Sequence, residues 1–211
     1  MPIQSPTSMP TAPHTQHTLN IVRCSWCSDA PLYQHYHDHE WGYPVADDQR
    51  LFEKISLEGF QAGLSWYTIL AKRENFRAAF AQFDFRKVAQ FTAADVERLM
   101  GDAGIVRHRG KIEAVIHNAQ RAIEMVQAEG SLAAFFWRYA PQAPSLGVDI
   151  PAQTAESLAL SKALKKRGWK FVGPTTMYAL MQAMGMVNDH APQCATRAKV
   201  EAAHRAFVRP A

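Results

Sequence analysis

Apolar residues recur at spacings of three and four through most of the chain, and this pattern restricts the possible folds more than any other feature. The clearest run consists of Ile112, Val115, Ile116, Ala119, Ile123 and Val126. This spacing places the six side chains on one face of a helix. No β-strand alternation extends beyond a few residues. The sequence therefore predicts an all-α fold.

Residues that favour helix N-termini predict where several helices begin. The candidate N-caps are Asp47 or Asp48, Ser65, Thr92 and Ser131. Thr92 and Asp95 have the spacing of a capping box. The helix after Ser65 is expected to carry a single apolar side formed by Trp66, Ile69, Leu70 and Phe76.

Residues 161–185 predict two helices joined by a short turn. The first helix ends at Gly168, and Pro174 suits the first position of the second helix. The free N–H groups of that second helix would bind a phosphate, next to Lys165, Lys166, Arg167 and Lys170. The alternative is an ordinary corner between two helices with a solvated basic face. A second basic cluster lies at 104–111, and a Pro-rich surface loop is expected at 141–154.

Composition limits the class of protein. A chain of 211 residues, 47% of them hydrophobic, can bury a core of its own, and residues 21–211 are expected to form a single domain. Residues 1–20 are rich in Pro, Thr, Ser and Gln, which predicts a disordered tail. The absence of an apolar run of about 18 residues predicts no membrane span. Three cysteines favour a reducing compartment, so we expect a cytoplasmic protein. The formal net charge of +4 permits an anionic partner.

The stretch HYHDHEWG, residues 35–42, combines three histidines with two acidic residues. His35, His37 and His39 alternate as strand residues do, and with Asp38 they could form a hydrolytic metal site that activates a water molecule. Such sites lie at strand ends, and no sheet is predicted here. A structural metal site is the competing interpretation.

A second unusual stretch is LEGFQAGLSW, residues 57–66, in which Glu58 is the one carboxylate. Glu58 either faces water or lies in a pocket where it recognises a ligand. The surrounding sequence is dense in aromatic residues that are candidates for the same pocket, although each is individually more typical of a core: Trp26, Tyr36, Trp41 and Trp66.

Seven strings carry a resemblance to a known family: RCSW, DAPLYQHYHDHEWG, LEGFQAGLSW, KREN, DAGIVRHRGKI, SKALKKRG and KFVG. From Arg23 to about Cys194 the chain resembles the 3-methyladenine DNA glycosylase I family of the helix-hairpin-helix superfamily. The resemblance implies two helical lobes around a cleft, a helix-hairpin-helix, and a monomer that acts on double-stranded DNA. It also implies flipping of 3-methyladenine out of the duplex and hydrolysis of its N-glycosidic bond by a monofunctional enzyme.

The resemblance also implies a structural Zn²⁺ that joins the two chain ends. Its ligands would be two Cys/His pairs: Cys24 with His37, and His190 with Cys194. The H-x-x-x-C spacing of the second pair places both ligands on one face if that segment is helical. Cys27 departs from the family pattern and leaves open which cysteine binds the metal.

The same resemblance assigns roles around the damaged base. Glu58 would accept hydrogen bonds from the base edge, and Trp26, Tyr36, Trp41 and Trp66 would hold the cationic ring. The implied DNA-contacting residues are Gly63, Leu64, Gly168, Lys170, Gly173 and Thr175.

Three alternatives remain open within this interpretation. Leu64 either fills the gap left by the flipped nucleotide or is a buried core leucine. Asp189 occupies the region of the catalytic aspartate of other superfamily members, or it caps or supports His190. No lysine occupies the Schiff-base position of lyase-type relatives. A zinc-stapled module that binds lesions without cutting is the alternative function, and such a module would not need the Glu58 carboxylate.

Overall fold

The computed structural model describes residues 21–210, in which there are helices and no strand. The all-α prediction is therefore confirmed for this part of the chain, while the predicted tail at 1–20 lies outside the described residues. No helix in the described range is long and apolar enough to cross a membrane. The elements are α1 (Pro31–His39), α2 (Asp48–Gln61), α3 (Trp66–Ala71), α4 (Arg73–Ala79), the 3₁₀-helix η1 (Ala81–Phe83), α5 (Phe85–Val88), α6 (Ala93–Gly101), α7 (Arg109–Glu129), α8 (Leu132–Trp137), α9 (Ala155–Lys166), α10 (Pro174–Ala183) and α11 (Arg197–Ala206).

The predicted N-caps are confirmed. The side chain of Asp47 accepts a hydrogen bond from a backbone N–H in the first turn of α2, and Ser65 and Ser131 do the same for α3 and α8. Thr92 and Asp95 form the capping box of α6. Each cap satisfies a backbone donor that the first helical turn leaves free. Residues 141–154 contain no helix, as predicted for the Pro-rich loop.

One predicted helix is divided in two. Helix α3 ends at Ala71, and Phe76 belongs to the separate helix α4, so the single apolar side predicted from Trp66 to Phe76 is wrong. The backbone of Lys72 leaves the helical region between the two, with φ −101° and ψ 1°. Phe76 is nevertheless fully buried, in contact with the ring of Phe60 at 4.6 Å between centroids.

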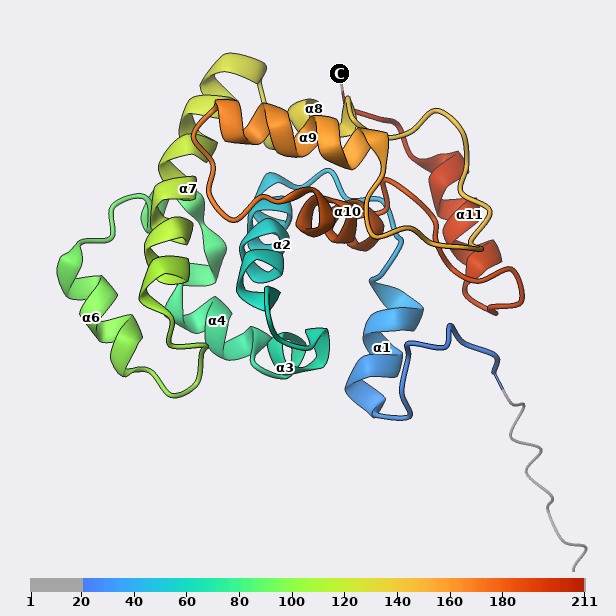
Figure 1. Cartoon of the computed structure of the whole chain (residues 1–211), viewed down its shortest axis with the longest axis horizontal. Helices are drawn as coiled ribbons and strands as arrows, with labels where there is room; N and C mark the ends of the chain where they lie inside the picture. The colour runs from blue at the N-terminus through green and yellow to red at the C-terminus, as the bar shows by residue number, and fades with distance from the viewer. Residues whose placement is uncertain (1–20, 211) are drawn as a thin grey trace, which may run out of the picture.

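Helix α2 lies at the centre of the molecule, between α7 and α10 (Figure 1). Its buried residues are 51, 52 and 54–60, which cover the whole circumference of the helix. A helix covered on all sides forms the core of its domain. Polar side chains on α2 are therefore withdrawn from bulk water, and Lys54 and Glu58 are two of them.

Helices α9 and α10 pack against each other and are joined by a turn at residues 167–173. Gly168 has a φ of +81°, which a residue with a side chain rarely adopts. Asn118 of α7 holds the turn, because its amide donates to the carbonyl of Lys170 (2.9 Å) and accepts from the N–H of Lys170 (2.8 Å). Pro174 begins α10, as predicted.

The two ends of the described chain meet beside α1. The N–H of Ala195 donates to the carbonyl of Val22 at 2.9 Å, and the N–H of Ala191 donates to the sulfur of Cys24 at 3.3 Å. Helix α11 follows this junction and lies on the same side of the molecule as α1 (Figure 1). Residues more than 160 positions apart are therefore brought within bonding distance.

Candidate active site and metal centre

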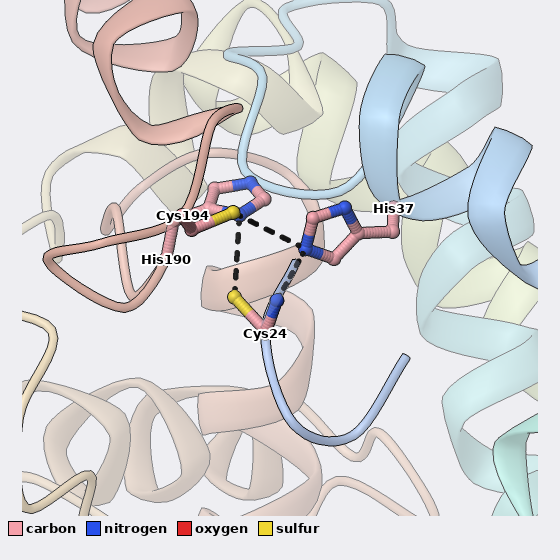
Figure 2. A group of neighbouring side chains, drawn as sticks. All are labelled: Cys24, His37, His190 and Cys194. Atoms are coloured by element: carbon pink, nitrogen blue, oxygen red, sulfur yellow. Dashed lines mark hydrogen bonds between the residues drawn. The ribbon is translucent and has the colours of Figure 1, made fainter. Parts of the chain in front are cut away.

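Four buried side chains converge where the chain ends meet (Figure 2). They are Cys24 from the segment before α1, His37 from α1, and His190 and Cys194 from the segment between α10 and α11. One potential ligand atom from each lies within 4.8 Å of all the others. The Nδ1 atom of His190 is 3.5 Å from both sulfurs. The sequence therefore named the members of this cluster correctly.

Hydrogen bonds outside the cluster orient both imidazoles. Nδ1 of His37 pairs with Asp38 at 2.8 Å, which leaves Nε2 for the cluster. Nε2 of His190 pairs with the carbonyl of Trp41 at 3.0 Å, which leaves Nδ1 for the cluster. Arg23 fixes Asp38 in turn through a bidentate contact. Ligand histidines of metal sites are typically held in this way.

Burial shifts the pKa values of two of these groups in opposite directions. It lowers the pKa of His190 to about 4, so that the imidazole is neutral and free to ligate at neutral pH. It raises the pKa of the Cys24 thiol to about 12, with a further contribution from Cys194. A thiol of this kind ionises at neutral pH when a metal ion binds it. Two thiolates and two imidazoles form a donor set that fits tetrahedral Zn²⁺.

The alternative site with three histidines is wrong. Residues 35–39 are helical and not extended, so alternate side chains point in nearly opposite directions. His37 is fully buried, whereas His35 and His39 are exposed and stack on each other with ring centroids 4.9 Å apart. The three rings therefore do not meet.

Cys27 lies outside the cluster of four. It is partly exposed and contacts the carbonyl of Ser28. The condition placed on the H-x-x-x-C segment is not met, because residues 190–194 form turns and not a helix. His190 and Cys194 converge through a turn in which the N–H of Cys194 donates to the carbonyl of Ala191 at 2.9 Å.

A cavity of about 250 Å³ opens beside the Cys/His cluster. All five residues predicted for the base pocket line this cavity: Trp26, Tyr36, Trp41, Glu58 and Trp66. Five further residues complete the lining, namely Tyr33, Gln61, Ile150, Ala179 and Gln182. The walls therefore come from α1, α2, α3, α10 and three loops.

The aromatic wall of the cavity packs directly on the two histidines of the Cys/His cluster. The rings of Trp26 and Trp41 are 4.9 Å apart in an edge-to-face arrangement. Trp26 contacts the ring of His37 at 5.1 Å, and Trp41 contacts the ring of His190 at 4.7 Å. Fixing the four ligands thus also fixes two walls of the cavity.

Glu58 is the one charged residue among the described residues that line the cavity. It is 5% exposed, and burial raises the pKa of its carboxyl group. Lys54, four residues earlier on α2, opposes this effect on the pKa with an ammonium group 3.6 Å from Oε1. The carboxylate is thus withdrawn from water. Of the two alternatives derived from the sequence, the structure shows a pocket position and not a water-facing one.

Comparison with known proteins identifies the family. The sequence model of a family described as methyladenine glycosylase matches residues 26–198. The chain belongs to the methyladenine glycosylase family. The chain is similar to DNA-3-methyladenine glycosylase 1 of Escherichia coli strain K12, with 54% identity over 82% of this chain and 96% of the relative.

Solved structures of the methyladenine glycosylase family have the same fold. A crystal structure of 3-methyladenine DNA glycosylase I is 53% identical, has a TM-score of 0.78, and covers 82% of this chain and 98% of its own. A variant of 3-methyladenine DNA glycosylase I in complex with 3-methyladenine is 39% identical, also with a TM-score of 0.78. The match covers 83% of this chain and 97% of that variant.

None of the residues predicted to contact DNA lines the cavity of this methyladenine glycosylase. Leu64 follows α2 and is 41% exposed, so the alternative of a buried core leucine is wrong. Gly63 before it has a φ of +85°. Lys170 and Thr175 are exposed at the turn and at the start of α10, and Gly173 is the N-cap of α10. Because α10 also supplies Ala179 and Gln182 to the cavity, it connects the turn with the pocket.

Asp189 is engaged by three donors. Its carboxylate accepts hydrogen bonds from Ser145, from the hydroxyl of Tyr178 (2.7 Å) and from the amide of Gln182 (2.8 Å). It is buried and does not line the cavity. The N–H of His190 instead donates to Asn188 at 3.2 Å. Asp189 therefore connects the Pro-rich loop to α10. Neither of the two roles considered from the sequence, a catalytic aspartate or a support for His190, describes this connection.

Helical spacing could have identified some of the missed residues. Lys54 and Gln61 lie four residues before and three after Glu58 on α2, and Tyr33 lies three before Tyr36 on α1. Gln182 and Ile150 come from distant segments and carried no comparable signal. Only the packing of α10 and the Pro-rich loop brings them to the cavity.

Proposed function

We propose that the chain is a DNA repair glycosylase that removes 3-methyladenine from DNA. The observation that carries the proposal is the buried Glu58 carboxylate in an aromatic cavity. The relatives named for 3-methyladenine glycosylase activity support it, as does the solved complex of one of them with 3-methyladenine. The reaction is hydrolysis of the N-glycosidic bond, which leaves an abasic site.

The positive charge of the methylated base explains why an aromatic pocket with one carboxylate can promote the reaction. Methylation at N3 makes the base of the intact nucleotide cationic and weakens its glycosidic bond, so selective binding supplies much of the catalysis. The faces of Trp26, Tyr36, Trp41 and Trp66 attract the cation by about 0.5–2 kcal/mol for each good contact. Glu58 accepts hydrogen bonds from the base edge and favours the methylated cation over neutral adenine.

We infer a monofunctional mechanism in which water attacks the sugar. No lysine is among the described residues that line the cavity. Lys54 is near but lies outside the lining, where its ammonium group donates to the hydroxyl of Tyr36. An amine that cannot reach the sugar cannot form a Schiff base with it.

We propose that Cys24, His37, His190 and Cys194 hold one Zn²⁺ ion. A site with four protein ligands leaves no position for a reactive water, so the ion has a structural role. The ion would join the two chain ends and brace the walls formed by Trp26 and Trp41. A single continuous core from Cys24 to Cys194 supports the proposal that residues 21–211 form one domain.

We propose that α9, the turn and α10 act as a helix-hairpin-helix that binds the backbone of double-stranded DNA. The N–H groups at Gly173 and Thr175 would face a phosphate, with Gly168 shaping the turn and the side chain of Lys170 beside it. Leu64 would enter the gap left by the flipped nucleotide, with Gly63 allowing the turn that presents it. In this arrangement a monomer holds the duplex across a cleft between two helical lobes.

Release of free bases tests the activity directly. Purified protein is incubated with DNA treated with a methylating agent, and the released bases are separated by chromatography. We expect 3-methyladenine without 7-methylguanine. A folded, zinc-loaded sample that binds this DNA and releases no base would contradict the proposal and favour the lesion-binding module.

A further inference from the structure

Lys54 is a buried amine directly behind the wall of the cavity. Its side chain is 6% exposed, and its Nζ atom lies 2.5 Å from the Tyr36 hydroxyl and 3.6 Å from Oε1 of Glu58. The same atom lies 3.6 Å from the ring centroid of Trp66. Lys54 does not line the cavity itself. It therefore contacts three pocket residues from outside the lining of the cavity.

The contact with Tyr36 constrains a proton. An ammonium group donates and cannot accept, so Lys54 takes up a lone pair of the Tyr36 oxygen. The hydroxyl hydrogen of Tyr36 has to point to another acceptor. Lys54 also covers one face of the Trp66 ring, so a base that stacks on Trp66 has to use the other face.

The other charges around Lys54 are already paired. Glu40 forms a bidentate pair with Arg73, and Glu53 forms one with Arg77. These four residues and Arg50 line a small cavity on the far side of Lys54. On the near side, the groups that titrate are Glu58, Tyr36 and Tyr33. Glu58 is thus the carboxylate next to Lys54 without an arginine partner in the described chain.

We propose that Lys54 is a positioning residue for base excision, which keeps the buried Glu58 carboxylate ionised and directs the Tyr36 hydroxyl proton toward the pocket. This inference rests on the proposed function, because it assumes that Glu58 binds the base. A buried carboxyl without a counter-charge takes up a proton and stops being an anionic acceptor. A pocket for a cationic base therefore depends on an ammonium group that the base never touches.

The pKa directions agree with this arrangement. Burial lowers the pKa of Lys54 to about 8 and Glu58 raises it, so Lys54 is protonated at pH 7. Burial raises the pKa of Glu58 and Lys54 lowers it. An opposite charge at this distance shifts a pKa by about 1–3 units. Removal of Lys54 should therefore raise the pKa of Glu58.

The test is the pH profile of base release by Lys54→Met, which keeps the length and the apolar stem of the side chain. We expect the acidic limb of kcat/KM to move upward by at least about one pH unit. The loss of activity relative to the wild type is then greatest at low pH and recovers as the pH rises, because Glu58 has to be ionised. Parallel profiles for the two proteins, whatever the size of a uniform loss, would overturn the proposal.

Two further variants separate charge from packing. Lys54→Gln retains a hydrogen-bond donor for Tyr36 but no charge, so its acidic limb should shift like that of Lys54→Met. Lys111→Met removes another buried ammonium, one that bonds the carbonyls of Phe60 and Ala62 and does not contact Glu58. Its acidic limb should coincide with that of the wild type. A shift in Lys111→Met equal to that of Lys54→Met would assign the effect to lost stability.

A measurement without substrate keeps this inference separate from the proposed function. The Glu58 carboxyl is followed by carbon-13 NMR in glutamate-labelled wild type and in Lys54→Met. We expect it to be ionised at pH 7 in the wild type and to titrate at higher pH in the variant. A wild-type Glu58 that is protonated at pH 7 would overturn the inference even if no variant folds. If the wild type releases no 3-methyladenine, the proposed function fails, and the titration still decides what Lys54 does.

Discussion

Glu58 shows how one residue combines a cost in stability with a use in binding. Its carboxylate is buried on a core helix beside one ammonium group, where a neutral side chain of the same shape would be easier to accommodate. Such a placement is expected where a charge is needed for recognition. Glu58→Gln should therefore reduce the release of 3-methyladenine by about 10- to 100-fold, the value of a hydrogen bond to a charged group.

The measurement is single-turnover base release from methylated DNA, with circular dichroism to verify the fold. Unchanged base release would remove Glu58 from the mechanism.

At the scale of elements, ion pairs fix the helices that carry the pocket. Arg73 of α4 forms a bidentate pair with Glu40 at the end of α1, and both side chains are largely buried. Burial raises the pKa of Glu40, but the bonds from Arg73 outweigh this and hold it below its ordinary value. The pair therefore stabilises the fold above the ordinary pKa of a glutamate, and this contribution is lost as the pH falls through the lower folded value.

Arg73→Met should cost about 1.5–3 kcal/mol in unfolding free energy at pH 7. The difference between the wild type and the variant should shrink as the pH falls from 5 toward 3, because Glu40 becomes protonated in both proteins. Urea unfolding midpoints at a series of pH values provide the measurement. A difference that stays constant over this range would show that Arg73 acts through packing alone.

The turn between α9 and α10 gives a second prediction at this scale. Lys170 is exposed there and has no ion-pair partner in the described chain. If it contacts a phosphate, Lys170→Ala should weaken DNA binding uniformly across sequences and lower the salt slope of log K by about 1.

The measurement is a DNA-binding titration at several salt concentrations. Lys199→Ala is the matched control, since Lys199 is an exposed lysine on α11, away from the turn. Equal salt slopes for Lys170→Ala and the wild type would show that Lys170 contacts no phosphate and that the turn is an ordinary corner between two helices.

At the scale of the molecule, the cluster of Cys24, His37, His190 and Cys194 lies where the two ends of the chain meet. Cys24 and Cys194 are separated by almost the whole described sequence, yet both sulfurs lie beside His190. Cys194→Ser should abolish stoichiometric zinc binding and lower the unfolding free energy by at least about 2 kcal/mol, or roughly 5 °C in melting temperature.

Zinc content by elemental analysis and melting by calorimetry test this prediction. Cys27→Ser is the control and should retain one equivalent of zinc, because Cys27 lies outside the cluster. Retention of zinc by Cys194→Ser would show that the ligand set is wrong.

The helix starts could be predicted from sequence because their causes are local. A cap such as Asp47 or Ser65 acts on a backbone group three residues away, and the apolar stripe of α7 repeats every three or four residues. The division between α3 and α4 was missed, because Phe76 is buried in α4 just as it would be in one continuous helix. The helical state of residues 35–39 was missed as well, because their alternation suggested an extended chain.

By itself, the sequence determined the helical class and the caps, and its family resemblance named the members of the Cys/His cluster and the aromatic and acidic residues that line the cavity. Only the tertiary structure decided what surrounds them: which histidine of residues 35–39 faces inward, how Lys54 meets Glu58 and Trp66, and how Gln182 reaches the cavity. Local signals act over about four residues, within one or two helical turns. The burial, charge and direction of a side chain depend on helices that are distant in sequence, and these meet only when the core forms.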